Sequence, residues 1–266
     1  MTELVGRVAV VTGGGSGIGR ATAHALARTG SAVVVADIDE DRAQAVAGEI
    51  TEAGGQALGL RCDVSEDDDV AMLRNRAIEE FGRVDVVMSN VGVLALGLPE
   101  NIPVEAWERI IDVNLLSVVR AVRTFLPGLL EQGSGHLVHT ASTAGLYGYS
   151  YDRLPYVATK SAIVLLSECL ALYTKPRGVG VTCLCPGPVM TNIAEHIEVF
   201  GPIAGPRTPE LAPLDPDTVG QLAVDAILED RFFVPTHPEV TDILIARARH
   251  VDEFVFEQAR RLSGDA

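Results

Sequence analysis

Three residues, Ser142, Tyr156 and Lys160, have the types and spacing needed to remove a proton from an alcohol. Tyr156 and Lys160 form a Tyr-x-x-x-Lys pair, which places both side chains on one face of a helix. A free phenol has a pKa of about 10 and is roughly 0.1% ionised at neutral pH, so it is a poor base. A nearby ammonium favours the phenolate, and lowering that pKa by about three units requires roughly 4 kcal/mol. This set predicts hydride transfer between an alcohol and a nicotinamide, with Tyr156 as general base.

A glycine-rich turn lies near the start of the chain, between an apolar run and a segment of helical period. It reads TGGGSGIG over residues 12–19 and contains Gly13, Ser16, Gly17, Ile18 and Gly19. Glycines let a backbone approach a pyrophosphate, and the free amides at a helix start can hold it. The spacing differs from the generic G-x-G-x-x-G pattern, and a tight strand-to-helix connection without a ligand would use the same residues. The turn therefore favours a dinucleotide site but leaves that alternative open.

Asp37 ends the second apolar run, where a carboxylate can accept hydrogen bonds from both hydroxyls of an adenosine ribose. A 2'-phosphate there would meet a like charge, and at about 4 Å and an effective dielectric of about 20 the repulsion is roughly 4 kcal/mol. Gly14, Gly15 and Ile38 offer no compensating cation, and Arg42 is the nearest one. The sequence therefore predicts NAD as the cofactor in preference to NADP.

The composition limits the kinds of partner. The chain has 266 residues and a formal net charge of -15, whereas nucleic acids and anionic membranes attract basic surfaces. No run approaches the roughly 18 uninterrupted apolar residues of a membrane span. We therefore expect a cytoplasmic protein with no nucleic-acid partner and no membrane partner.

The cysteines and histidines show no pattern of metal ligands. The four cysteines lack C-x-x-C spacing, and Cys183 and Cys185 occupy an apolar run where they would pack as small hydrophobic residues. The six histidines form no i, i+4 pair beside a carboxylate. We expect no metal site.

Short β-branched runs alternate with longer segments of helical period, which is typical of a parallel sheet covered by helices. The predicted strands are residues 8–11, 32–36, 57–61, 84–89, 136–140, 179–184 and 232–234. The predicted helices are residues 18–29, 40–52, 66–81, 104–130, 155–173, 217–228 and 240–261, the third beginning with a capping box of Ser65 and Asp68. We predict an α/β, doubly wound Rossmann-type fold, a single parallel sheet of about seven strands with helices on both faces, as one domain over residues 1–266.

One long irregular segment, residues 190–216, contains five prolines and several apolar residues. A loop of this length inside a compact domain is often a substrate lid. We predict a lid here, and a disordered excursion is the alternative.

The glycine turn, Asp37 and the Ser142, Tyr156 and Lys160 set occur together in the order typical of one enzyme family. The chain resembles the compact, non-extended subgroup of the short-chain dehydrogenases/reductases from about Val5 to Thr191, and more loosely to its end. Each motif alone is weak, but six in the family's order argue against chance. The resemblance implies a single Rossmann-type domain of seven parallel strands, usually assembled as a homotetramer or dimer.

The resemblance also assigns cofactor contacts by position. Asp63 and Val64 resemble the pair that contacts adenine. Residues 89–92 read SNVG where the family has Asn-Asn-Ala-Gly, so Asn90 and Gly92 are kept and only local packing is in doubt. Residues 186–191, PGPVMT, resemble the segment that fixes the nicotinamide. The alternative is that the two prolines only end a strand. The cofactor residues implied are Gly13, Ser16, Gly17, Ile18, Gly19, Asp37, Asp63, Val64, Asn90, Gly92, Tyr156, Lys160, Pro186, Gly187, Val189 and Thr191.

The catalytic residues implied by the resemblance are Asn114, Ser142, Tyr156 and Lys160. Asn114 resembles the asparagine whose backbone carbonyl orders a water in a proton relay to the lysine, and the alternative is a polar residue that bends a helix. Ser142 would donate a hydrogen bond to the developing carbonyl oxygen, and its distance in sequence from Tyr156 suggests one extra residue in the loop 147–154. Lys160 would lower the pKa of Tyr156 and hold the nicotinamide ribose.

An apolar substrate pocket is expected near the hydride site. Its proposed wall consists of residues 93–98, Tyr147, Tyr149, Tyr151, Ile193, Ile197, Val199, Phe200 and Ile203. Such a cavity suits a lipophilic alcohol or ketone, cyclic, terpenoid or steroid-like, although these residues could instead pack the lid against the body. Arg153 and Arg207 could bind a single carboxylate.

Two other functions remain in competition. A 3-oxoacyl thioester reductase would prefer NADPH and need a basic patch to bind an acidic carrier protein. Asp37 opposes the NADPH preference, and the net charge of -15 opposes the basic patch. A non-catalytic NAD(H)-sensing protein would be free to lose the serine, tyrosine or lysine, and this chain keeps all three. A serine hydrolase is disfavoured because Ser142 lacks a G-x-S-x-G elbow.

Overall fold

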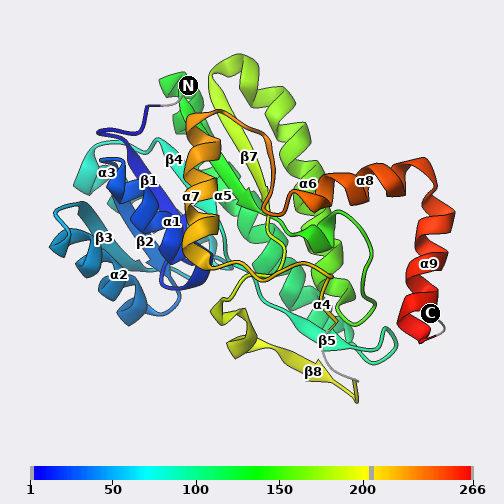
Figure 1. Cartoon of the computed structure of the whole chain (residues 1–266). Coiled ribbons are helices and arrows are strands. Elements are labelled where there is room, and N and C mark those ends of the chain that lie inside the picture. The colour runs from blue at the N-terminus through cyan, green and yellow to red at the C-terminus, as the bar shows by residue number, and fades with distance from the viewer. Residues whose placement is uncertain (1–2, 204–206, 265–266) are drawn as a thin grey trace.

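Seven short runs rich in valine and other small apolar residues form the strands of a parallel sheet in the computed structural model, which describes residues 3–203 and 207–264. The strands are β1 (Val8–Thr12), β2 (Ala32–Asp37), β3 (Gln56–Arg61), β4 (Val86–Ser89), β6 (Gly135–Thr140), β7 (Val179–Cys185) and β9 (Phe233–Pro235). Their spatial order is β3-β2-β1-β4-β6-β7-β9, so the direction of winding reverses between β1 and β4 (Figure 1). This arrangement confirms the predicted doubly wound fold.

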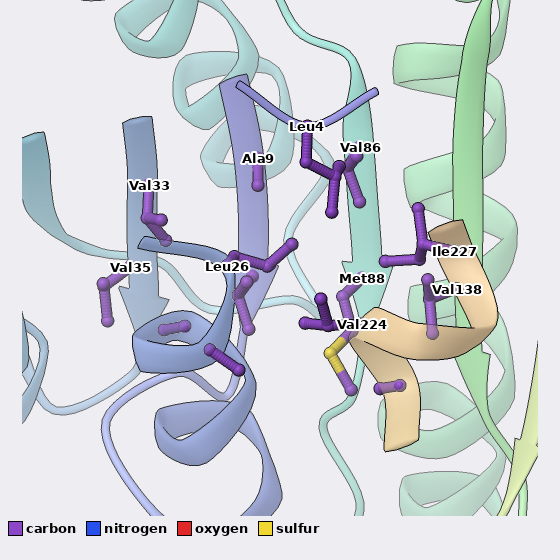
Figure 2. Close-up of a cluster of buried hydrophobic side chains, with 14 of the residues drawn as sticks. Leu4, Ala9, Leu26, Val33, Val35, Val86, Met88, Val138, Val224 and Ile227 are labelled. Carbon is purple, nitrogen blue, oxygen red and sulfur yellow. The ribbon is translucent and has the colours of Figure 1, made fainter. Parts of the chain in front are cut away.

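Helices cover both faces of the sheet. Ala9 and Val11 of β1 pack into one core with Leu26 and Val224, whereas Val10 points into a second core on the opposite face. Figure 2 shows the first core, where α1 (Gly17–Arg28) and α7 (Pro216–Leu228) meet the sheet. The helix α2 (Glu40–Glu52) packs on the same face, and α3 (Asp67–Phe81), α5 (Ser117–Gln132) and α6 (Leu154–Thr174) cover the other. Alternate strand residues enter opposite layers because successive side chains of a strand point to opposite faces.

The predicted helix over residues 104–130 is interrupted. It consists of α4 (Val104–Ile110), a π-helical segment η1 (Ile111–Leu116) and then α5. Asn114 is buried in the π-helical segment and hydrogen-bonds the backbone of Val93 rather than its own helix. Such wide turns are rare and occur mostly at functional sites.

The predicted helix over residues 240–261 is two helices, α8 (Glu239–Arg249) and α9 (Val251–Ser263). His250 separates them with a non-helical backbone, at φ -146° and ψ 74°. After this break α9 lies beside the loop that precedes α6, where the rings of Phe254 and Tyr147 meet edge to face with centroids 6.3 Å apart. A tertiary contact therefore accompanies the break, which helical periodicity does not reveal.

The predicted capping box at α3 is wrong. The N-cap is Glu66, and its side chain makes no capping bond. The Ser65 hydroxyl instead donates to Asp63 Oδ1 over 2.6 Å, and the Ser65 N–H donates to the same oxygen over 2.9 Å. A local turn centred on the Asp63 carboxylate has replaced the cap.

The described part of residues 190–216 has more structure than a plain loop. A short 3-10 helix η4 (Asn192–His196) is followed by β8 (Glu198–Phe200), which pairs in parallel with β5 (Ala95–Gly97). Val189 and Leu214 form an isolated bridge where the segment leaves and rejoins the body. The described residues therefore tie the segment to β5, the strand after β4, and its role as a lid stays a prediction.

Two helical stretches, Val104–Gln132 and Leu154–Arg177, are long and apolar enough to span a membrane by length and mean hydropathy. The first stretch is divided into α4, η1 and α5, and the second consists of α6 and a short 3-10 helix. Each stretch packs against the sheet through buried residues such as Phe125 and Ile163. Core helices pass the same test, so this is weak evidence for a membrane span.

Two histidines of β6, His136 and His139, are buried and hydrogen-bonded to hydroxyl groups of Thr182 and Ser167. Burial lowers the pKa of each to about 4. Between about pH 6.5 and pH 4 the unfolded chain binds protons that the folded chain does not, so the free energy of unfolding falls as the pH falls through that range. A shift of this size corresponds to roughly 3 kcal/mol for each histidine.

We therefore expect His139→Gln to show a smaller loss of stability on acidification than the wild type. Urea unfolding at about pH 7 and about pH 4.5 measures the difference, and carboxylates contribute equally to both proteins. His250→Gln is the control, because His250 is exposed. Equal pH dependence in the wild type and His139→Gln would contradict the prediction.

Candidate active site

A cavity of about 580 Å³ opens at the carboxyl ends of the central strands, where the winding reverses. Ligands of open α/β sheets bind at such a reversal. Of the site residues predicted from the sequence, those that line the cavity are Gly13, Ser16, Gly17, Ile18, Asp37, Asp63, Val64, Asn90, Gly92, Ser142, Tyr156, Lys160, Pro186, Gly187, Val189 and Thr191. Gly19 and Asn114 do not line it.

Gly19 packs directly against the backbone of the glycine turn. A Cβ atom on Gly19 would lie 2.0 Å from the carbonyl oxygen of Gly13, so only glycine lets α1 pack this close to the turn. Gly13 itself has φ of 63°, in the left-handed region that glycine adopts without strain. The turn is therefore shaped to bring backbone N–H groups to the cavity, with Gly19 as a packing residue.

The Asp37 carboxylate lies at the edge of this turn. It accepts the Gly15 N–H over 2.9 Å and the Asp39 N–H over 3.1 Å. Asp37 lines the cavity and is half-buried, so part of its carboxylate remains open to a ligand.

Arg42, the nearest cation to Asp37, also lines the cavity but is held by carboxylates. Its guanidinium lies 3.1 Å from Glu195 in η4 and 3.3 Å from Asp39. The Glu195 contact links the 190–216 segment to α2 beside the cofactor end of the cavity. Sequence reasoning missed Glu195, because residues so far apart in the chain give no local signal of pairing.

Tyr156 and Lys160 occupy the first turns of α6, and both enter the cavity as the spacing predicted. The Lys160 ammonium lies 5.6 Å from the centre of the Tyr156 ring and donates to the Thr140 carbonyl over 2.7 Å. Lys160 is 2% exposed, and burial lowers its pKa to about 8. The side chain can therefore exchange a proton near neutral pH.

The pKa of Tyr156 depends on burial and on nearby polar groups. Burial raises the pKa of Tyr156, while the nearby Ser142 hydroxyl and the positive charge of Arg153 oppose that rise. In the chain alone the cation that opposes this rise is Arg153, and the lowering of this pKa by Lys160 stays a prediction. A phenol in this state is protonated and suited to act as an acid, and its action as a base requires further positive charge.

Ser142 begins the short 3-10 helix η2 (Thr143–Gly145) after β6. Its hydroxyl accepts the Ala144 N–H over 3.1 Å and donates to the Pro186 carbonyl over 3.4 Å. Ser142 is 8% exposed and lines the cavity. These contacts fix its hydroxyl at the end of the cavity that Tyr156 occupies.

Asn114 uses its side chain to hold the loop after β4. Its Oδ1 accepts the Val93 N–H over 2.8 Å, and its Nδ2 donates to the Val93 carbonyl over 3.0 Å. Gly92 lies between Asn114 and Lys160, because a Cβ atom on Gly92 would be 3.4 Å from Lys160 Nζ and 3.9 Å from Asn114 Oδ1. The asparagine is thus close to the lysine without entering the cavity.

We expect Asn114→Ala to lower the free energy of unfolding by roughly 1–3 kcal/mol, because the Val93 N–H and carbonyl lose their partner. Urea unfolding measures this loss. The control is Asn75→Ala, since Asn75 is exposed on α3 and should change stability by less than about 0.5 kcal/mol. A loss no larger than that of Asn75→Ala would contradict the structural role.

The predicted apolar wall is only partly correct. Val93, Leu94, Tyr149 and Ile193 line the cavity. Tyr147 and Tyr151 do not line the cavity. The Tyr147 ring packs on Tyr149, with ring centres 5.8 Å apart, and Tyr151 is 36% exposed. Residues 95–98, Ile197, Val199, Phe200 and Ile203 do not line the cavity. Residues 95–97 form β5, and Val199 and Phe200 pair with it in β8. Residues that line it in their place, and that sequence reasoning missed, include Val113, Met190, Asn192, Thr208, Pro209 and Pro213.

The cysteines and the other possible metal ligands do not converge. In the described ranges, no group of three His, Cys, Asp or Glu side chains could hold a metal ion. Cys183 and Cys185 are buried with sulfur atoms 3.7 Å apart. Cys62 lines the cavity, and burial raises the pKa of its thiol to about 12, so the thiol is neutral.

Comparison with known proteins places this geometry among enzymes. A family model described as short chain dehydrogenase matches residues 7–199. A cyclohexanol dehydrogenase of Acinetobacter sp. (strain SE19) is 33% identical and covers 89% of this chain and 93% of its own. A 1-deoxy-11-beta-hydroxypentalenate dehydrogenase of Streptomyces exfoliatus is 33% identical, over 95% of this chain and 88% of its own. A short chain dehydrogenase/reductase from Burkholderia phymatum, solved in complex with NAD, has a TM-score of 0.85 at 33% identity, covering 95% of this chain and 96% of that one.

Proposed function

This chain belongs to the short-chain dehydrogenase family, and from that premise we propose an NAD-dependent enzyme that interconverts a lipophilic secondary alcohol and a ketone. The observation that carries the proposal is the convergence of Ser142, Tyr156 and Lys160 on one cavity with the glycine turn and Asp37. The NAD complex of the Burkholderia phymatum protein supports a dinucleotide in this position.

The cofactor end of the cavity fits a dinucleotide. The glycine turn presents backbone N–H groups at the start of α1, where a pyrophosphate is favoured. Asp37 would accept hydrogen bonds from the adenosine ribose, Asp63 and Val64 would contact adenine, and Thr191 would contact the carboxamide. When bound, NAD supplies the hydride acceptor. Asp37 supports NAD over NADP, as does Arg42, whose positive charge Glu195 and Asp39 already compensate.

The protein's own residues would handle the proton. In oxidation Tyr156 takes the proton of the substrate hydroxyl, and in reduction it returns a proton to the carbonyl oxygen. Ser142 donates a hydrogen bond to that oxygen, and Lys160 holds the nicotinamide ribose and adds positive charge beside the phenol. The close approach of Lys160, Gly92 and Asn114 supports a proton relay behind the site.

The substrate end of the cavity supports a lipophilic substrate. Val93, Leu94, Ile193 and Pro209 line it together with the ring of Tyr149. The volume of about 580 Å³ belongs to the whole cavity, which includes the cofactor end as well as this substrate end. The names of the cyclohexanol and hydroxypentalenate dehydrogenases support a ring alcohol as the substrate class. The described residues of the 190–216 segment contribute to this wall, which fits a lid.

The family and the protein surface support an expectation about the assembly, the location and the partners of the enzyme. We expect a single domain in a homotetramer or dimer, located in the cytoplasm, with no nucleic-acid or membrane partner. Exposed apolar side chains on α6, Leu165 and Leu172 at 61% and 76% exposure, support an interface between copies. The net charge of -15 opposes binding to nucleic acids.

A panel of ring and open-chain secondary alcohols and ketones tests the proposal, with NAD and NADP supplied separately and the absorbance of the reduced nicotinamide followed. We expect turnover with ring alcohols and NAD. Turnover with NADP alone would refute the cofactor assignment. Dinucleotide binding without turnover of any member would favour a sensing protein.

A further inference from the structure

Arg153 is a buried cation at the substrate end of the cavity. It lies immediately before α6, is 7% exposed and lines the cavity together with Tyr149 and Tyr156. Its guanidinium carbon lies 5.9 Å from the centre of the Tyr149 ring. The two other basic side chains that line the cavity within the described chain are Lys160, bound to the Thr140 carbonyl, and Arg42, held by Glu195 at the cofactor end.

Part of the Arg153 guanidinium is fixed by a neighbouring carboxylate. Nε donates to Asp152 Oδ1 over 2.8 Å, and Nη2 donates to the Arg207 carbonyl and more weakly to Asp152. Nη1 donates to none of the residues that the structure describes, and it is not among the fully buried unpaired atoms. Because Arg153 lines the cavity, this nitrogen is the donor left for a ligand.

The Asp152 carboxylate accepts hydrogen bonds from several donors. It accepts the Ser150 hydroxyl and, over 2.9 Å, the Arg207 N–H, in addition to the Arg153 guanidinium. Asp152 is 2% exposed, so it lies behind Arg153 rather than at the cavity surface. Asp152 and Arg153 form a buried ion pair, and of the two only Arg153 lines the cavity. The guanidinium is therefore the member that faces a ligand, and its positive charge opposes the rise in the pKa of Tyr156.

Arg207, the second candidate for a carboxylate, is turned outwards. Its guanidinium donates to the Tyr151 hydroxyl over 2.7 Å and lies 4.8 Å from the centre of that ring, away from the cavity. Only its backbone takes part, by holding both Asp152 and Arg153 in place.

We propose that Arg153 is a specificity-determining residue that binds a carboxylate of the substrate, which would be an apolar ring alcohol or ketone carrying that carboxylate close to its carbinol carbon. This inference rests on the proposed function, which puts the carbinol at Tyr156. A guanidinium suits the task because it is always charged and its planar N–H groups match a carboxylate. One guanidinium with one donor nitrogen left over fits a single carboxylate.

The test measures binding of two isosteric probes, cyclohexanecarboxylate and cyclohexanecarboxamide, to the complex of the enzyme with NADH at neutral pH, by the change in nicotinamide fluorescence. We expect the wild type to bind the carboxylate at least about tenfold more tightly than the amide. Arg153→Gln should raise the Kd of the carboxylate by about tenfold or more and that of the amide by less than about threefold. Arg153→Lys should retain part of the preference, because the charge remains.

Controls separate this role from a structural one. Arg207→Gln should leave the preference unchanged, since its guanidinium lies outside the cavity. If Arg153→Gln unfolds because Asp152 loses its partner, Asp152→Asn/Arg153→Gln removes both charges and should show the same loss of preference. No preference in the wild type, or equal weakening of both probes by Arg153→Gln, would overturn the proposal. Probe binding does not require turnover, so failure of the alcohol panel is a separate result that bears on the proposed function.

Discussion

Tyr156→Phe should lower kcat by roughly 10³-fold while NAD binds with a Kd within about fivefold of the wild type. The substitution removes the hydroxyl that takes or returns the substrate proton and keeps the ring that packs in the cavity. Steady-state rates with the best alcohol of the panel and titration with NAD measure the two effects. The structure strengthens this expectation, because Ser142 and Arg153 act directly on the phenol.

The matched control is Tyr173→Phe. Tyr173 lies on the same helix, is 49% exposed and is not among the residues that line the cavity. Its substitution should leave kcat within about twofold of the wild type. Retention of more than a few per cent of activity by Tyr156→Phe would show that another group, or water, moves the proton.

Asp37→Asn should shift the preference for NAD over NADP by about 10²-fold in kcat/KM. Asparagine keeps an oxygen for the Gly15 N–H but removes the charge that would repel a 2'-phosphate, a repulsion of roughly 4 kcal/mol at about 4 Å before screening by solvent. The gain with NADP should grow in Asp37→Asn/Glu195→Gln, because Arg42 would lose one of its carboxylate partners.

The control for the cofactor shift is Asp41→Asn, which makes the same change of charge at an exposed position nearby. Its NAD to NADP ratio should stay within about threefold of the wild type. An unchanged ratio in Asp37→Asn would mean that the turn, rather than the carboxylate, selects the cofactor.

Much of the site was predictable because its geometry is short-range. Tyr156 and Lys160 share a helix face through their spacing alone, and the turn over residues 12–19 needs glycine for reasons local to its backbone. Asp37 could be placed at a strand end by counting along one apolar run. The sheet itself was predictable because strand and helix periods alternate along the chain.

Other features of the site depend on contacts between distant segments. The pairing of β8 with β5 removed Val199 and Phe200 from the expected substrate wall, although their apolar character is evident in the sequence. Glu195 reached Arg42, and the backbone of Arg207 reached Asp152. No local pattern indicates such pairs, because each depends on how a long segment folds back over the body.

The amino-acid sequence by itself determined which chemical groups this protein has and which of them share a helix, a turn or a strand end. Only the tertiary structure decided how those groups behave. The pKa of Tyr156 rises because packing from several elements removes water from the phenol, and Arg153, which is close only through the fold, opposes the rise. Burial and the distances between charges depend on the whole fold, so the direction of such a shift cannot be deduced from spacing along the chain.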